Sequence, residues 1–199
     1  MRFANRLVIF VRQPRLGTGK RRLARDIGAS AALSFARTTL AQTLRRLARD
    51  RRWVTYIAVT PDRARPWPAK INVLAQGAGD LGARMARAAR GLPPGPAVIV
   101  GCDIPGLTAA HVAAAFRKLG ACDAVFGPAT DGGYWLVGLR RRPRFIDPFT
   151  NVRWSTRHAL ADTLANLDGH SVAMAATLAD VDDGAAFATR IRMGSPSAS

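Results

Sequence analysis

The chain has 199 residues, a length that favours one compact domain, which we place at residues 1–193 with a disordered tail at residues 194–199. Its two cysteines, Cys102 and Cys122, form neither a C-x-x-C pair nor a zinc motif. Nothing in their spacing suggests a disulfide framework, and we expect the reducing cytoplasm. No apolar run approaches the ~20 residues of a membrane span, and the net charge of +17 predicts attraction of anions, nucleic acid included.

Apolar runs and apolar spacing predict strands that alternate with helices along the chain. Strands are expected at residues 6–11, 53–59, 71–74, 97–100, 124–126, 134–139 and 171–174. Helices are expected at residues 20–49, 81–90, 109–119, from Ser155 or Thr156 to about 167, and from Asp183 to about 193. This alternation is typical of a mostly parallel sheet that is covered on both faces, and the adjacent strands at 124–126 and 134–139 interrupt it.

A single carboxylate follows the run at 97–100, whose apolar, β-branched character is typical of a buried parallel strand. Gly101 ends the run, Asp103 comes two residues later, and Thr108 stands where it can cap the next helix. Ligands of open α/β sheets bind beyond the carboxyl ends of the strands, where an ionised Asp suits a divalent cation that carries phosphates. Taken alone, Asp103 is simply a turn residue, and the other motifs favour the metal-binding interpretation.

A loop between the first predicted strand and the first predicted helix combines glycines with cations. Gly17 and Gly19 let the backbone approach a ligand, and Arg12, Lys20 and Arg22 add positive charge. The pattern is neither a P-loop nor a dinucleotide fingerprint. It indicates a phosphate site, with a basic loop that binds no ligand as the equal alternative.

Three further stretches place acidic residues near predicted strand ends. The glycine-rich stretch at residues 76–82 suits close approach to a ligand, and helix capping is the simpler interpretation of Asp80. Asp131 precedes two glycines, a pattern typical of a hairpin turn, which would also point it toward the same edge of the sheet. Asp180 and Asp182 have the alternate spacing that lets two carboxylates share one cation, and Asp183 is placed to cap the last helix.

Together these stretches resemble the bacterial family DUF2064, also known as transferase 1, rSAM/selenodomain-associated, among the GT-A-like nucleotide-diphospho-sugar transferases. The resemblance extends from about residue 8 to 186. It implies a GT-A fold, which is a single three-layer αβα sandwich with a mostly parallel mixed sheet and the nucleotide at the strand ends. It also implies that the loop at 17–22 binds the phosphates, that Asp103 is the metal-binding Asp, and that Asp182 or Asp180 is the second carboxylate. The residues that carry it are Pro14, Gly17, Lys20, Arg22, Leu23, Gln76, Gly79 to Gly82, Arg84, Met85, Gly101, Asp103, Pro105 to Leu107, Gly127, Pro128, Asp131 to Tyr134, Gly138, Leu139, Trp154 to Thr156 and Asp180 to Asp182.

The chain departs from the family pattern where the family has glutamates. Ala83, Thr130 and residues 184–186 stand in their places, and the chain contains no glutamate at all. Arg21 replaces a Thr, and Arg12 replaces a Lys, which keeps the charge but not the geometry. These changes affect the acceptor site more than the phosphate site.

The resulting hypothesis is a Mg²⁺- or Mn²⁺-dependent glycosyltransferase with a nucleotide-diphospho-sugar donor and an unidentified small-molecule acceptor. Asp103 with Asp182 or Asp180 would hold the cation, and Lys20 would act on the leaving phosphates. The rest of the donor site would comprise Arg12, Gly17, Gly19, Arg22, Gln76, Gly79 and Asp80. Because the chain lacks glutamate, Asp131 is the expected residue to orient or deprotonate the acceptor.

Two alternatives stay open at this point. A nucleotidyltransferase would use the same donor site for a nucleoside triphosphate, with a phosphorylated acceptor and pyrophosphate as the leaving group. A basic nucleic-acid-binding protein on an inactive transferase scaffold would account for the charge. However, the charge is spread along the chain, and no nucleic-acid-binding module is evident.

Overall fold

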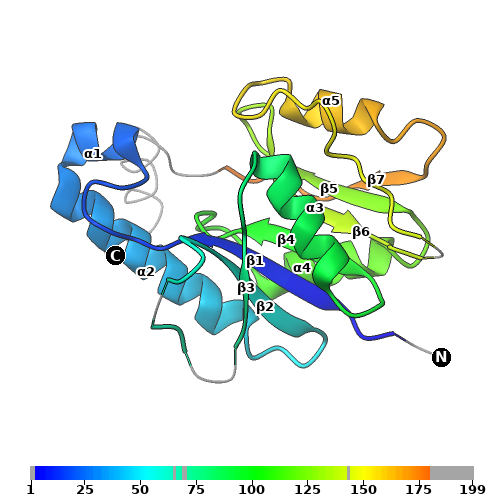
Figure 1. Cartoon of the computed structure of the whole chain (residues 1–199), viewed down its shortest axis with the longest axis horizontal. Helices are drawn as coiled ribbons and strands as arrows, with labels where there is room; N and C mark the ends of the chain where they lie inside the picture. The colour runs from blue at the N-terminus through cyan, green and yellow to red at the C-terminus, as the bar shows by residue number, and fades with distance from the viewer. Residues whose placement is uncertain (1–2, 65, 69–70, 143, 180–199) are drawn as a thin grey trace, which may run out of the picture.

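The apolar, β-branched runs of the sequence form the strands of a single sheet in the computed structural model, which describes residues 3–64, 66–68, 71–142 and 144–179. Its seven strands lie in the order β3-β2-β1-β4-β6-β5-β7 (Figure 1). All the pairings are parallel except those of β6 with β4 and β5. The strands are β1 (Arg6–Arg12), β2 (Val54–Thr60), β3 (Asn72–Ala75), β4 (Ala97–Gly101), β5 (Ala124–Pro128), β6 (Tyr134–Leu139) and β7 (Val172–Met174). The mostly parallel mixed sheet and the interruption at β5 and β6 are thereby confirmed.

Helices cover both faces of this sheet. The described helices are α1 (Arg21–Ile27), α2 (Ala29–Leu47), α3 (Leu81–Gly91), α4 (Ala109–Lys118) and α5 (Ala159–Ala165). Apolar residues of α2 and α4 pack on one face, in a cluster that includes Leu7, Ile9 and Val11. Those of α3 and α5 pack on the other face, in a cluster that includes Val8 and Phe126. The expected three-layer αβα sandwich is confirmed, because successive strand residues alternate between the two clusters.

The prediction of one helix over residues 20–49 is wrong. The chain forms α1 and α2 instead, and the break lies at Gly28, whose backbone adopts φ 86° and ψ 151°. This conformation ends a helix, and glycine adopts it without the cost that a side chain would add. Apolar spacing is helical on both sides of Gly28, so the spacing pattern does not reveal the break.

The capping residues behave as expected for two helices and not for a third. The Asp80 carboxylate accepts a hydrogen bond from the Ala83 amide at 2.8 Å, and the Thr108 hydroxyl accepts one from the His111 amide. However, α5 begins at Ala159 rather than after Ser155 or Thr156, so that predicted start is wrong. The Thr156 hydroxyl instead donates to the Arg153 carbonyl at 2.7 Å, which holds a turn ahead of the helix.

The domain limits stay a prediction, and the helix expected from Asp183 to about 193 lies outside the described residues. Over the part of the chain that is described, none of the helices combines the length and the apolar character that crossing a bilayer requires.

Candidate active site

Three loops that carry charged residues meet at one edge of the sheet. The carboxyl ends of β1 and β4 are neighbours, because Phe10 pairs with Gly101 in the parallel register. β6 is antiparallel to both β4 and β5, so β5 runs in the same direction as β4, as does β7, which is parallel to β5. The loop that follows the carboxyl end of β5 therefore reaches the same edge. Lys20 follows β1, Asp103 follows β4, and Asp131 lies between β5 and β6. The expectation that these residues share an edge is confirmed.

Lys20 and Asp103 form an ion pair across this edge. The Lys20 Nζ donates to Asp103 Oδ2 at 3.0 Å, and the side chains are 12% and 44% exposed respectively. Asp103 Oδ1 lies over Gly101, where an added Cβ would be 3.1 Å from it. Lys20 has φ 40° and ψ 43°, a left-handed conformation that costs an L-residue ~1–2 kcal/mol. Strained residues of this kind cluster at functional sites.

A cavity of about 490 Å³ opens beside this ion pair, and we call it the loop cavity. The β1–α1 loop supplies much of its wall, including Arg12, Gly17, Gly19 and Lys20, and Asp103 also lines it. Small apolar residues of α2 line it as well. Its volume is in the range of small-molecule sites. The cavity thus combines a space of small-molecule size with a cationic lining, which consists of Arg12, Arg15, Lys20, Arg21 and Arg25.

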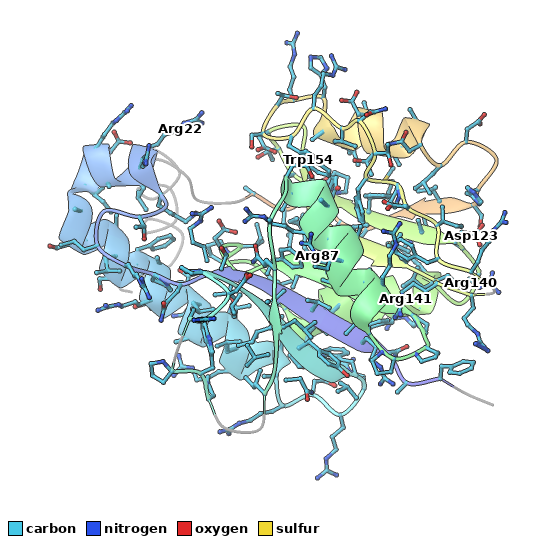
Figure 2. All side chains as sticks on the ribbon, in the orientation of Figure 1. Arg22, Arg87, Asp123, Arg140, Arg141 and Trp154 are labelled. Atoms are coloured by element: carbon cyan, nitrogen blue, oxygen red, sulfur yellow. The ribbon has the colours of Figure 1, made fainter. Side chains whose placement is uncertain are left out.

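Arg22 stands apart from the predicted phosphate site. It is exposed on α1 and is absent from the lining of the loop cavity (Figure 2). Arg21 and Arg25 line the cavity instead, and sequence reasoning missed both. Residues four apart lie on one face of a helix, so the i, i+4 spacing of these two arginines is the signal that could have found them.

A second cavity of about 240 Å³ shares Asp103 with the first, and we call it the aromatic cavity. Asp131, Tyr134 and Trp154 line it, together with Leu81 at the start of α3. Asp131 is exposed, and its Oδ1 accepts a hydrogen bond from the Gly133 amide at 2.9 Å, as in the predicted turn. Asp103 therefore lies at the junction of a cationic and an aromatic compartment.

The Asp131 loop is held against the first turn of α5 and the residues just before it. The Leu160 amide donates to the Gly132 carbonyl at 3.1 Å. Gly132 has φ 86°, and a Cβ added there would be 2.3 Å from the Arg157 carbonyl oxygen. Only glycine fits this approach, which fixes where Asp131 stands.

Gly132→Ala is therefore expected to destabilise the fold by ~2–4 kcal/mol, because it adds overpacking to the left-handed backbone cost. The matched control is Gly169→Ala, where φ is 74° but no atom lies within 4 Å of the added Cβ. The control should lose only ~1 kcal/mol. Urea denaturation measures both values, and equal losses would contradict the close packing of the loop.

The stretch at 76–80 is held by structural contacts. Gln76 is buried, and its Nε2 donates to the carbonyls of Val11 and Ala58. Arg87, which sequence reasoning missed, donates to the Gln76 carbonyl from α3 (Figure 2). Asp80 caps α3, and the Gly79 carbonyl accepts from the Arg84 Nε at 2.9 Å. None of Gln76, Gly79 and Asp80 lines the loop cavity, and their role in nucleotide binding stays a prediction.

Asp180 and Asp182, the expected partners of Asp103, lie outside the described residues. Within residues 3–179, with their gaps, no three His, Cys, Asp or Glu side chains form a group that could hold a metal ion. The last described residues return to the site, because the Leu178 amide donates to the Pro128 carbonyl at 3.2 Å. A half-exposed carboxylate beside a cationic cavity fits a Mg²⁺ or Mn²⁺ ion that takes its other ligands from phosphates and water.

Cys102 lies next to Asp103, and its thiol is expected to react slowly with electrophiles. Burial raises the pKa of Cys102 to about 12, and the negative charge of Asp103 acts in the same direction. At pH 8 only ~10⁻⁴ of the thiol is then the nucleophilic thiolate. We expect iodoacetamide to modify Cys122 well before Cys102 in the folded protein, and both equally in urea, with peptide mass spectrometry as the measurement. Equal rates in the folded protein would contradict this placement of Cys102.

The chain matches one family of known proteins in sequence. Residues 43–156 match the family described as "Uncharacterized protein conserved in bacteria (DUF2064)". No curated protein matches the chain in sequence. A candidate nucleotide-diphospho-sugar transferase from Desulfovibrio desulfuricans G20 has a solved structure that is similar over 98% of this chain and 89% of its own, with 27% identity and a TM-score of 0.85.

Two more distant structures share the fold alone. The 4-diphosphocytidyl-2C-methyl-D-erythritol synthase of Anaerococcus prevotii DSM 20548 is 9% identical over 96% of this chain and 98% of its own, with a TM-score of 0.64. Rv0371c of Mycobacterium tuberculosis H37Rv, in complex with manganese, is 14% identical over 96% of this chain and 100% of its own, with a TM-score of 0.56. The expected GT-A-like fold is confirmed by these similarities together with the sheet.

Proposed function

The chain belongs to the DUF2064 family, and from that premise we propose that it is a metal-dependent glycosyltransferase that uses a nucleotide-diphospho-sugar donor. The observation that carries the proposal is the position of Asp103, which lines both the loop cavity and the aromatic cavity and pairs with Lys20. A donor in one cavity and an acceptor in the other would meet at this residue. The relative from Desulfovibrio desulfuricans G20 supports a transferase of this class.

The loop cavity would bind the donor diphosphate. Its arginines and the Lys20 ammonium would balance the negative charge that grows on the phosphates as the sugar leaves. Preorganised charge of this kind usually contributes more to catalysis than any other single effect, because it costs no reorganisation during the reaction. The small apolar residues of α2, such as Ala32 and Ala36, give the cavity a wall that accepts a flat base or ribose.

Asp103, with Asp182 or Asp180 from the segment beyond Ala179, would hold a Mg²⁺ or Mn²⁺ ion against the diphosphate. When bound, the ion supplies Lewis-acid stabilisation of the departing phosphate oxygens. Asp131 would accept the proton from the acceptor hydroxyl as that oxygen attacks the anomeric carbon. Tyr134 stays a neutral hydroxyl on this side, because burial raises its pKa well above the ordinary value for tyrosine.

Nucleotidyl transfer is the second candidate, because the same edge of the sheet would suit a nucleoside triphosphate. In that reaction a phosphorylated acceptor attacks the α-phosphorus and pyrophosphate leaves. The two reactions differ in their products, so product identity decides between them.

The experiment is a thermal-shift screen of nucleoside diphosphates, triphosphates and nucleotide sugars with and without Mn²⁺, followed by ³¹P NMR of any stabilising donor. We expect a nucleotide sugar to bind with Mn²⁺ and a nucleoside diphosphate to be released. Pyrophosphate released from a triphosphate would establish nucleotidyl transfer instead. Salt-sensitive DNA binding without Mn²⁺-dependent nucleotide binding would reject both.

A further inference from the structure

The aromatic cavity differs in charge from the rest of the molecule. The chain carries 30 Lys and Arg against 13 acidic residues. Yet none of the described residues that line this cavity is Lys, Arg or His, whereas Asp103 and Asp131 both line it. Its wall is otherwise apolar or hydroxylic. A phosphate or carboxylate placed there would face two carboxylates and no cation from this lining, which disfavours an anion.

Several cations lie close to this lining without belonging to it, and each has a partner of its own; Arg153, next to Trp154, pairs with Asp162. Arg84 lies on α3 between the lining residues Leu81 and Met85, and its Nε donates to the Gly79 carbonyl at 2.9 Å. Arg157 follows the lining residue Thr156, is exposed, and contacts the ring of His158 at 3.5 Å. Lys20 pairs with Asp103 and lines the loop cavity. Lys20 therefore offsets the charge of Asp103, and Asp131 is the lining carboxylate for which no ion pair is found among the described residues.

The rest of the lining includes the aromatic rings of Tyr134 and Trp154. Tyr134 and Trp154 meet edge to face with their centroids 6.3 Å apart, and both line the cavity. Trp154 stands beside the start of α3 (Figure 2). Leu81, at the same end of the helix, is 44% exposed although it is large and apolar. Leu81, Tyr134 and Trp154 thus give the cavity an apolar and aromatic wall against which a ring or alkyl group could pack.

We propose that the aromatic cavity binds an acceptor that carries no negative charge, a neutral or cationic alcohol whose hydroxyl is attached to an aromatic or apolar body. The inference rests on the proposed function in one respect, which is that this compound is called the acceptor of the transfer. In the transfer, the acceptor oxygen forms a bond to the anomeric carbon, and the bond from that carbon to the diphosphate oxygen breaks with its electron pair. The hydroxyl proton passes to Asp131, and the nucleoside diphosphate leaves. A phosphorylated acceptor, as nucleotidyl transfer to a sugar phosphate would need, does not suit this cavity.

Binding is tested without turnover, by NMR of the ¹⁵N-labelled full chain. The probes are 2-phenylethanol, 2-phenylethylamine and phenyl phosphate, which present the same ring with a neutral, a cationic and an anionic group. The reporter is the indole N–H signal of Trp154, identified by its loss in Trp154→Phe. We expect the alcohol and the amine to shift this signal saturably. Phenyl phosphate should move it at least ~10-fold more weakly, although it shifts amide signals of residues 17–21.

Leu81→Lys serves as the variant that alters the charge of the cavity, because it places a cation at the rim. It should let phenyl phosphate shift the Trp154 signal and should weaken binding of the amine. Phenyl phosphate that shifts this signal in the wild-type protein as readily as the alcohol would overturn the inference, and so would the absence of any shift with the three probes. Donor binding is measured separately in the nucleotide screen, so failure of the proposed function gives a different result from failure of this inference.

Discussion

Asp103→Asn is expected to lower kcat for donor turnover by at least ~10²–10³-fold, the loss seen when a single stabilising group is removed from a preorganised site. The amide keeps the shape of the side chain but loses the charge that would hold the divalent cation. It also removes an ionic partner of Lys20, whose side chain is 12% exposed. The measurement is release of nucleoside diphosphate from the donor identified in the screen, at saturating Mn²⁺.

The control for this variant is Asp168→Asn, which removes an exposed carboxylate after α5. It changes the net charge by the same amount and should keep wild-type turnover. Circular dichroism of both variants verifies that the fold is intact. If Asp103→Asn turned over donor as fast as Asp168→Asn does, the carboxylate would have no part in the reaction.

Lys20→Ala and Lys20→Gly are expected to lose activity together and to differ in stability. Both remove the ammonium that faces the donor phosphates, and both should lower kcat/KM by ~10²-fold. The backbone of residue 20 has φ 40° and ψ 43°, which glycine adopts freely and alanine does not. Lys20→Gly should therefore be more stable than Lys20→Ala by ~1 kcal/mol in urea denaturation.

Comparing Lys20→Gly with Lys20→Ala distinguishes an effect on catalysis from an effect on stability, because the more stable variant is expected to be as inactive as the less stable one. Lys20→Arg keeps the charge with a different geometry and should recover only part of the activity. Wild-type kcat/KM in Lys20→Gly would remove the ammonium from the mechanism, and equal stabilities of the glycine and alanine variants would contradict the left-handed backbone.

Most of the sheet could be predicted because strands such as those at residues 6–12, 97–101 and 134–139 are short apolar runs bounded by Gly, Pro or a charged residue. The rule that ligands bind beyond strand carboxyl ends then placed Lys20, Asp103 and Asp131 at one edge. The break at Gly28 could not be read in the same way, because the apolar spacing continues through it. The start of α5 was also missed, because Ser155 and Thr156 resemble caps but form a turn.

Which side chains of a helix line the site depends on how that helix is rotated about its own axis, and the spacing of residues in the sequence does not determine this rotation. Arg22 was expected at the phosphates, yet Arg21 and Arg25 line the loop cavity. The role of Gln76 in nucleotide binding stays a prediction, and its amide group donates to two carbonyls of the sheet, which the sequence did not reveal. The absence of cations among the described residues lining the aromatic cavity was not visible either, because residues from five separate stretches of the chain meet there, at positions 10, 81–85, 99–104, 129–137 and 154–159.

The central claim is that Asp103 helps to hold a divalent cation against a nucleoside diphosphate. Electron paramagnetic resonance of Mn²⁺, titrated into the protein with ADP, GDP, UDP, CDP or dTDP, tests it most directly. We predict that one of these nucleotides tightens Mn²⁺ binding to the wild-type protein and that Asp103→Asn abolishes this increase. Equal Mn²⁺ binding by the two proteins in the presence of that nucleotide would contradict this role of Asp103.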